Sequence, residues 1–276
     1  MQEHDLSYAP IGVFDSGVGG LTVAREIMRQ MPNERIIYFG DTARVPYGSK
    51  SKETIIRFSR QIIRFLQSKG VKALVVACNT ASALALEEIQ PELDLPIIGV
   101  LKPGAKAAAG ATKNGKIGVI ATESTIASQL YTKVIQSHAP RAQVFGKACP
   151  LFVPLVEEGW LNDPVTKEVA ERYLDPLTKS GIDALIMGCT HYPLLTSVLQ
   201  QVAGPQVRLI DPAYETTREL KALLADCGLL NDGRKLPEGD LHQFYVSDAA
   251  EKFRKLANFI LPYGIDTTQL IHIEEY

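Results

Sequence analysis

The stretch ALVVACNTASALALEEI, residues 73–89, joins a short apolar run to a helical pattern through Cys78. A second stretch, ALIMGCTHYPLLTSVLQ at residues 184–200, has the same plan and places Cys189 at the same sixth position. The two cysteines stand 111 positions apart (189 − 78 = 111). A short apolar run that leads into a helix is typical of a buried strand in a parallel sheet. The sequence therefore predicts the same strand–cysteine–helix unit twice.

Two further matches extend this repeat in the same order along the chain. The tripeptide IGV occurs at 11–13 and again at 117–119, at an offset of 106. Val153-Pro154 follows Val45-Pro46 at an offset of 108. Three ordered matches with a slowly growing offset predict two homologous halves.

Apolar strands alternate with amphipathic helices in both halves. In the helix predicted over 49–70, five apolar residues share one face and Gly70 suits the C-terminal cap: Ile55, Ile56, Ile62, Ile63 and Leu66. This alternation predicts an α/β fold of two doubly wound parallel-sheet domains that face each other across a cleft.

The 65 residues after Asp211 (276 − 211 = 65) are too few for a comfortable third domain. Their pattern predicts a helix at 214–230, a polar loop at 234–240, a strand at 242–247 and a helix at 248–261 with Asp248 as its N-cap. We expect this tail to pack on the first half. The expected domains are therefore 1–98 with 212–276, and 99–211.

The composition excludes several classes of protein. The net charge of −2 (29 basic and 31 acidic side chains) gives no sign of a nucleic-acid or membrane-surface partner. The first ten residues lack the apolar core of a signal peptide, and the apolar runs are too short to span a membrane. Four cysteines without a CxxC pair indicate a reduced, cytoplasmic chain with no metal site.

Polar residues follow several of the predicted strands. In open α/β sheets, ligands bind beyond the carboxyl ends of the strands, where Cys78, Cys189, Asp15, Asp41 and Thr122 are expected. Facing domains would bring the two cysteines to opposite walls of one cleft. That arrangement suits inversion of a stereocentre, because one group removes a proton from one face while the other delivers a proton to the opposite face. A thiol with a pKa of about 8.5 can serve in either role.

Other interpretations of these residues remain open at this point. Either cysteine can be a small buried hydrophobe, Asp15 a helix cap, and Glu157 part of a solvated helix face. The glycines of DSGVGGLT can bind a phosphate, although they match neither GxGxxG nor a Walker loop. Cys189 and His191 also suit a thiol hydrolase or lyase of a small dicarboxylate, which leaves Cys78 unexplained. A non-catalytic amino-acid-binding module is a further alternative.

Four motifs resemble the glutamate racemase family, within the wider aspartate/glutamate racemase superfamily: GVFDSGVGGLTV, YFGDTARVPYG, VVACNTASA and GCTHYPLL. The resemblance covers nearly the whole chain, and the motifs keep the family's order and spacing. It implies racemisation of glutamate without a cofactor, which supplies D-glutamate for peptidoglycan in the cytoplasm. The VPYG and CTHYP forms favour glutamate, and aspartate is the alternative substrate. We also expect a homodimer.

The resemblance also assigns roles to individual residues. It implies that Cys78 and Cys189 are the acid/base thiols, with Asp15 assisting the first and His191 and Glu157 assisting the second. Ser16, Asn79, Thr80 and Thr190 would hold the α-carboxylate and amino groups of the substrate. Tyr47, Gly48 and Thr122 would lie near its side-chain carboxylate. Glu158 stands beside Glu157, so the sequence leaves open which of the two faces the site.

Overall fold

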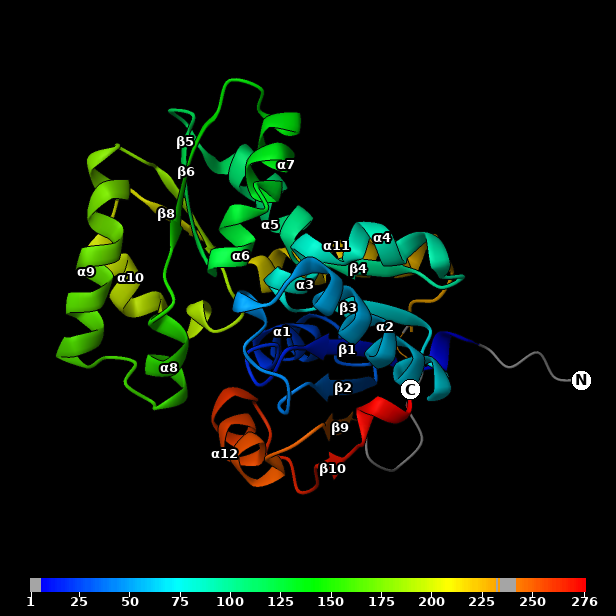
Figure 1. Ribbon diagram of the computed structural model, residues 1–276. Coiled ribbons are helices and arrows are strands. Elements are labelled where there is room, and N and C mark those ends of the chain that lie inside the picture. Colours follow the sequence, from blue (N-terminus) through cyan, green and yellow to red (C-terminus); the bar gives the residue numbers. More distant parts are fainter. Residues whose placement is uncertain (1–5, 232, 234–241) are drawn as a thin grey trace, which may run out of the picture.

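The computed structural model describes residues 6–231, 233 and 242–276 and contains two separate sheets (Figure 1). The polar loop predicted at 234–240 lies outside the described residues. All the strand pairs in both sheets are parallel. The predicted fold of two parallel-sheet α/β domains is confirmed.

The first sheet has the strand order β10-β9-β2-β1-β3-β4. Its strands are β1 (Ile11–Asp15), β2 (Ile36–Gly40), β3 (Ala73–Val76), β4 (Ile97–Gly99), β9 (His242–Val246) and β10 (Gln269–Leu270). The last two come from the C-terminal tail, and β9 pairs with β2 along its whole length. The tail therefore packs on the first half, as the sequence predicts.

The second sheet repeats the first. Its strands are β5 (Lys116–Ala121), β6 (Gln143–Ala148), β7 (Ala184–Gly188) and β8 (Arg208–Ile210), in the order β6-β5-β7-β8. This order corresponds strand for strand to β2-β1-β3-β4. The register also repeats, because Ile11 pairs with Ala73 and its counterpart Ile117 pairs with Ala184. The internal repeat read from the sequence is thus a repeat of topology and of register.

Helices cover both faces of the first sheet because its strands are apolar on both sides. Val13 packs into a core with α1 (Leu21–Gln30), α11 (Pro212–Asp226) and α12 (Ala250–Ile260). Phe14, the next residue, points to the opposite face, which α2 (Lys52–Ser68), α3 (Asn79–Leu84) and α4 (Leu86–Ile89) cover. The helix α2 ends as predicted, with Gly70 in the left-handed region at φ 69° just after it.

The second sheet is enclosed in the same way. One face packs against α8 (Phe152–Glu157), α9 (Pro164–Lys179) and α10 (Thr196–Ala203). The other packs against α5 (Leu101–Ala111) and α7 (Leu130–His138), while the short α6 (Glu123–Ala127) lies against α3 of the first half. The helix α11 contacts both α1 and α5, so it forms a seam between the halves (Figure 1).

The predicted cap of the last helix is wrong. Ala249, not Asp248, is the N-cap residue of α12, and it has a left-handed φ of 51° and no side-chain capping bond. The Asp248 carboxylate instead accepts a hydrogen bond from the adjacent N–H of Ala249, at 2.6 Å. A side chain engaged with its immediate neighbour cannot reach the free N–H groups of the first helical turn.

Five 3₁₀ turns complete the described elements. They are η1 (Leu6–Tyr8), η2 (Tyr47–Ser49), η3 (Gln90–Glu92), η4 (Tyr192–Leu195) and η5 (Ile273–Glu275). Two of them, η2 and η4, lie in loops that follow the carboxyl ends of β2 and β7. None of the helices in the described part of the chain is both long and apolar enough to cross a bilayer.

Candidate active site

A cavity of about 220 Å³ opens between the carboxyl ends of the two sheets. Loops from both halves form its walls, as the sequence predicts from the strand ends. The residues that line it are Ser16, Gly17, Val45, Pro46, Tyr47, Gly48, Cys78, Asn79, Thr80, Thr122, Val153, Pro154, Glu157, Cys189, Thr190 and His191. The cavity therefore gathers every predicted site residue except Asp15.

Cys78 occupies the start of a helix at the end of β3. It is the N-cap of α3, and its sulfur accepts a hydrogen bond from the N–H of Ala81 at 3.5 Å. The Oγ of Ser16, which follows β1, lies 3.8 Å from the same sulfur. Burial, reinforced by the charge of Asp15, raises the pKa of the Cys78 thiol to about 12.

Cys189 follows β7 directly and has an imidazole as its neighbour. His191 Nδ1 lies 3.8 Å from the Cys189 sulfur, and His191 Nε2 lies 3.3 Å from Oε1 of Glu157. Burial alone would lower the pKa of His191, but hydrogen bonds with Cys189 and Glu157 outweigh it and raise the pKa to about 10. The hydrogen bond to His191 lowers the pKa of Glu157 to about 2. The imidazole is thus poised to be charged beside the second thiol.

The structure separates the two adjacent glutamates. Glu157 lines the cavity and contacts His191, whereas Glu158 lies with Trp160 in a different, apolar surface hollow. Glu158 keeps helical backbone angles, and successive residues of a helix point about 100° apart, so the two side chains face different directions.

Asp15 is completely buried and lies behind the cavity wall. Its Oδ2 accepts a hydrogen bond from the N–H of Gly17 at 3.1 Å, and its Oδ1 accepts one from the hydroxyl of Thr190 at 3.5 Å. Burial raises the pKa of Asp15, although the charge of His191 and backbone N–H groups oppose this effect. The carboxylate therefore links residues that line the cavity from both halves.

Side-chain hydrogen bonds join the two halves around the cavity. Thr80 of α3 lies 3.0 Å from the hydroxyl of Thr122, which is the N-cap of α6. Tyr131 of α7 donates a hydrogen bond of 2.6 Å to the amide oxygen of Asn79. Burial raises the pKa of the Tyr131 phenol, so the hydroxyl stays protonated and remains a donor. These bonds fix the polar lining in place.

A second set of contacts holds the loop after β2. The hydroxyl of Tyr47 donates to the buried carboxylate of Asp41, which also binds the Arg44 guanidinium at 2.8 Å. Across the cavity, the Ser124 hydroxyl donates to the carbonyl of Gly48 at 2.5 Å. A Cβ at Gly48 would lie 2.8 Å from the Cβ of Thr122, so glycine permits this close approach.

No lysine or arginine lines the cavity within the part of the chain that the structure describes. Besides the His191 imidazole, the polar groups available to an anionic ligand are hydroxyls, the Asn79 amide and backbone N–H groups of the loops. The same described residues contain no cluster of three or more His, Cys, Asp or Glu side chains that could hold a metal ion.

The site contains residues that the sequence interpretation did not assign. Val45-Pro46 and Val153-Pro154 line the cavity from opposite halves, and Gly17 also lines it. The signal was present in the sequence, because these two Val-Pro pairs are one of the repeat matches. The contact of Lys252 with Glu157 left no such signal, since it joins segments 95 residues apart.

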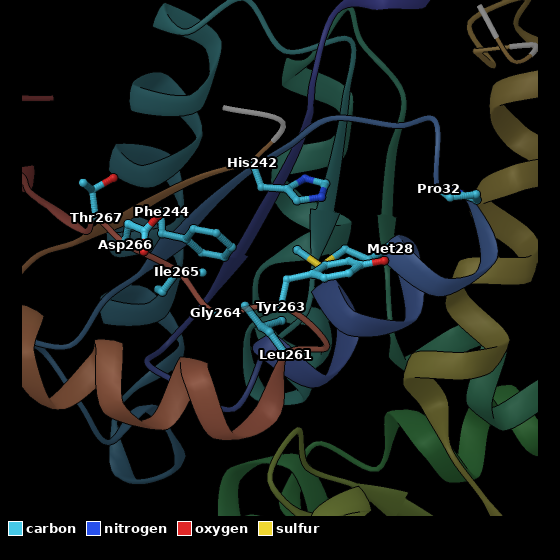
Figure 2. Close-up of a pocket in the computed structure, with 10 residues that line it drawn as sticks. All are labelled: Met28, Pro32, His242, Phe244, Leu261, Tyr263, Gly264, Ile265, Asp266 and Thr267. Atoms are coloured by element: carbon cyan, nitrogen blue, oxygen red, sulfur yellow. The ribbon is translucent and has the colours of Figure 1, made fainter. Parts of the chain in front are cut away.

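A second cavity, of about 300 Å³, lies beside β9 and the segment after α12 (Figure 2). Met28, His242, Phe244 and Tyr263 are among its lining residues. It includes none of the predicted site residues and lies at the starting end of β9, away from the cysteine loops.

Comparisons with known proteins agree with this arrangement. The family model for Asp/Glu/Hydantoin racemase matches residues 11–220. A glutamate racemase of Geobacter metallireducens is 49% identical over 256 residues, which span 93% of this chain and 94% of that protein. A glutamate racemase of Chlorobaculum tepidum is 46% identical over 273 residues, which span 98% and 99% of the two chains.

The crystal structure of the glutamate racemase isoform RacE1 from Bacillus anthracis matches with a TM-score of 0.91 and 42% identity, over 96% of this chain and 98% of that one. The Francisella tularensis enzyme, solved in complex with D-glutamate, matches with a TM-score of 0.89 and 39% identity, over 98% and 100%. Because the family model and these relatives each cover most of the sequence, the chain belongs to the Asp/Glu/Hydantoin racemase family and, within it, to the glutamate racemases.

Proposed function

We propose that this protein interconverts L- and D-glutamate by direct proton transfer at the α-carbon, with Cys78 and Cys189 as the two acid/base groups. The observation that carries this proposal is that the two repeat-related cysteines line one cavity from opposite halves. The relatives named glutamate racemase, one of them solved with D-glutamate, support glutamate as the substrate.

In the proposed reaction, the thiolate of one cysteine takes the α-proton and becomes a thiol. The C–H bond breaks, and its electron pair remains on the α-carbon and spreads into the α-carboxylate. The other cysteine, as a thiol, delivers its proton to the opposite face and becomes a thiolate. The reverse direction exchanges the two roles, so the site must support both protonation states of each sulfur.

The two thiols have different means of reaching the thiolate form. Burial opposes ionisation of Cys78, while Ser16 and the N–H of Ala81 favour it, and the ammonium group of a bound amino acid would favour it further. Asp15, whose own pKa is raised by burial, is proposed to assist Cys78. On the other side, His191 is proposed to exchange a proton with Cys189 while Glu157 orients the imidazole.

The polar lining is proposed to bind the ends of the substrate separately. Ser16, Asn79, Thr80 and Thr190 would hold the α-carboxylate and amino groups, and Asp15 would support them from behind the wall. Tyr47, Gly48 and Thr122 would receive the side-chain carboxylate. Hydrogen bonds to the α-carboxylate would also stabilise the negative charge that develops in the transition state.

The remaining assignments are proposals that rest on broader observations. Residues 1–98 with 212–276 and residues 99–211 are proposed as the two domains, because each set supplies the strands of one sheet apart from Gly99, the last residue of β4. Closure of these domains over the substrate would exclude water. Four free cysteines support a cytoplasmic location, where D-glutamate would serve peptidoglycan synthesis. A homodimer without nucleic-acid or membrane partners is proposed as well.

The test is to incubate the purified protein with L-glutamate in D₂O, with no cofactor added. The expected result is loss of the circular dichroism signal together with deuterium at the α-carbon. Retained optical activity with both L- and D-glutamate under reducing conditions would contradict the proposal. Turnover of aspartate alone would identify an aspartate racemase instead, and accumulation of a covalent thioester would identify a thiol hydrolase or lyase.

A further inference from the structure

The carboxylate of Glu157 divides its two oxygens between two partners. Oε1 lies 3.3 Å from Nε2 of His191, on the cavity side. Oε2 lies 3.1 Å from Nζ of Lys252, on the solvent side. A carboxylate held through both oxygens has a defined plane and direction, whereas one held through a single oxygen can turn about its last bond.

Lys252 reaches this carboxylate from the other half of the molecule. It belongs to α12 of the C-terminal tail, which is anchored on the first sheet by the fully buried Phe253 and Ala257. Glu157 ends α8, which packs on the second sheet. Figure 1 shows α8 and α12 next to each other on the same side of the molecule. The ion pair therefore bridges the two sheets beside the cavity.

We propose that Lys252 is a positioning residue for the proton transfer at Cys189: by holding Oε2 of Glu157 from the opposite half, it keeps Oε1 directed at His191 when the two halves are together. The inference rests on the proposed function, because it assigns Lys252 to the acid/base group of that same site. The Lys252–Glu157 contact also means that His191 is held in its protonated form only when the two halves lie together.

The consequences for His191 follow from its surroundings. Three titratable groups face the imidazole: Cys189 after β7, Glu157 from α8 and Asp15 at the end of β1. His191 is only 6% exposed, so it depends on these neighbours to carry a proton. If Glu157 turned towards water, the imidazole would lose one of the hydrogen bonds that raise its pKa.

Removing Lys252 also removes a positive charge, which by itself would favour protonation of His191. This effect is the smaller one. The Lys252 side chain is 58% exposed, so water screens its charge, and the Glu157 carboxylate contacts Lys252 through one oxygen and the imidazole through the other. The loss of orientation of the Glu157 carboxylate therefore outweighs the loss of the Lys252 charge, and the pKa of His191 is expected to fall.

The first variant is Lys252→Met, which keeps the apolar stem and removes only the charge. Lys252 does not line the cavity, so KM for glutamate is expected to stay unchanged. The expected fall in kcat is about two- to fivefold, the range that an exposed ion pair supports. The alkaline limb of the kcat profile is expected to move to lower pH. Lys252→Arg should restore both properties.

The matched control is Lys255→Met on the same helix. Lys255 is also exposed, and it forms no ion pair with the residues that the structure describes. Its removal should leave kcat and the pH profile unchanged. Potassium chloride at 1 M should lower kcat of the wild type towards that of Lys252→Met and change the variant less, because salt screens the exposed pair.

An NMR titration of His191, with ¹³C-labelled imidazoles, measures the pKa without turnover. A lower pKa in Lys252→Met than in the wild type supports the inference. An unchanged pKa together with an unchanged kcat and pH profile overturns it, and so does failure of Lys252→Arg to restore them. A wild type that does not racemise glutamate refutes the proposed function, while the titration still decides whether Lys252 positions Glu157.

Discussion

Nδ1 of His191 lies 3.8 Å from Sγ of Cys189, the residue two places before it in the chain. The related thiol of Cys78 has no imidazole among its described neighbours, and a hydroxyl, Oγ of Ser16, lies at the same distance of 3.8 Å. The internal repeat therefore reproduces the cysteine and the strand before it, but not the side chain that lies next to the sulfur. The two proposed proton transfers would therefore take place beside different groups, an imidazole at Cys189 and a hydroxyl at Cys78.

Replacing either Cys78 or Cys189 by alanine is expected to abolish racemisation, since each change removes one of the two proposed acid/base groups. The loss should be at least about 10²–10⁴-fold, the range for a positioned acid or base. Circular dichroism with L- and D-glutamate measures it. Cys227→Ala is the control, because Cys227 is exposed and outside the cavity. Full turnover in either single cavity variant would contradict the two-thiol mechanism.

The Glu157–His191 contact is expected to give stability a defined pH window. The folded pKa of Glu157 is about 2 against an ordinary 4.5, so its contribution is present above 4.5 and is lost as the pH falls towards 2. The folded pKa of His191 is about 10 against 6.5, so its contribution is present below 6.5 and is lost as the pH rises towards 10.

The free energy of unfolding of the wild type should therefore exceed that of Glu157→Gln most between pH 4.5 and 6.5. Urea denaturation at several pH values measures the difference. A difference that stays constant from pH 3 to 9 would show that the contact does not stabilise the folded state.

Gly19→Ala is expected to displace two side chains of the site and so to lower its activity. A Cβ at this position would lie 2.2 Å from Oγ1 of Thr190 and 2.5 Å from Nδ1 of His191, so both side chains must move. A displacement of about 1 Å can cost about 10²-fold in rate. Steady-state kinetics should show a lower kcat. Gly110→Ala, where a Cβ meets nothing within 4 Å, is the control and should keep full activity.

Tyr131→Phe is expected to weaken both stability and substrate binding. It removes the 2.6 Å hydrogen bond to Asn79 and leaves a buried amide oxygen without its donor, at a cost of about 1–3 kcal/mol. The Asn79 amide would then be free to turn, which should raise KM. Thermal unfolding and kinetics measure these effects, and Tyr263→Phe on an exposed ring is the matched control. An unchanged KM would argue against a binding role for Asn79.

The sequence by itself determined the architecture of two parallel-sheet domains and the positions of Cys78 and Cys189 at equivalent strand ends. Strand burial and helix faces depend on the local alternation of apolar and polar residues, and the repeat of IGV, Val-Pro and cysteine placed equivalent residues at equivalent strand ends. The structure repeats that pattern in its register, with Ile11 paired to Ala73 and Ile117 paired to Ala184. The Val-Pro pairs that line the cavity could have been predicted from the same repeat.

Only the tertiary structure decided which polar groups meet between the halves. In the structure Glu157, not Glu158, lines the cavity and contacts His191. Asp15 lies behind the cavity wall and binds Thr190, and Lys252 of the tail contacts the Glu157 carboxylate. Local propensity also failed at Asp248, whose side chain binds the N–H of Ala249 instead of capping α12. The physical reason is that periodicity reports which face of an element is buried, whereas contacts across a cleft depend on how two finished domains are placed against each other.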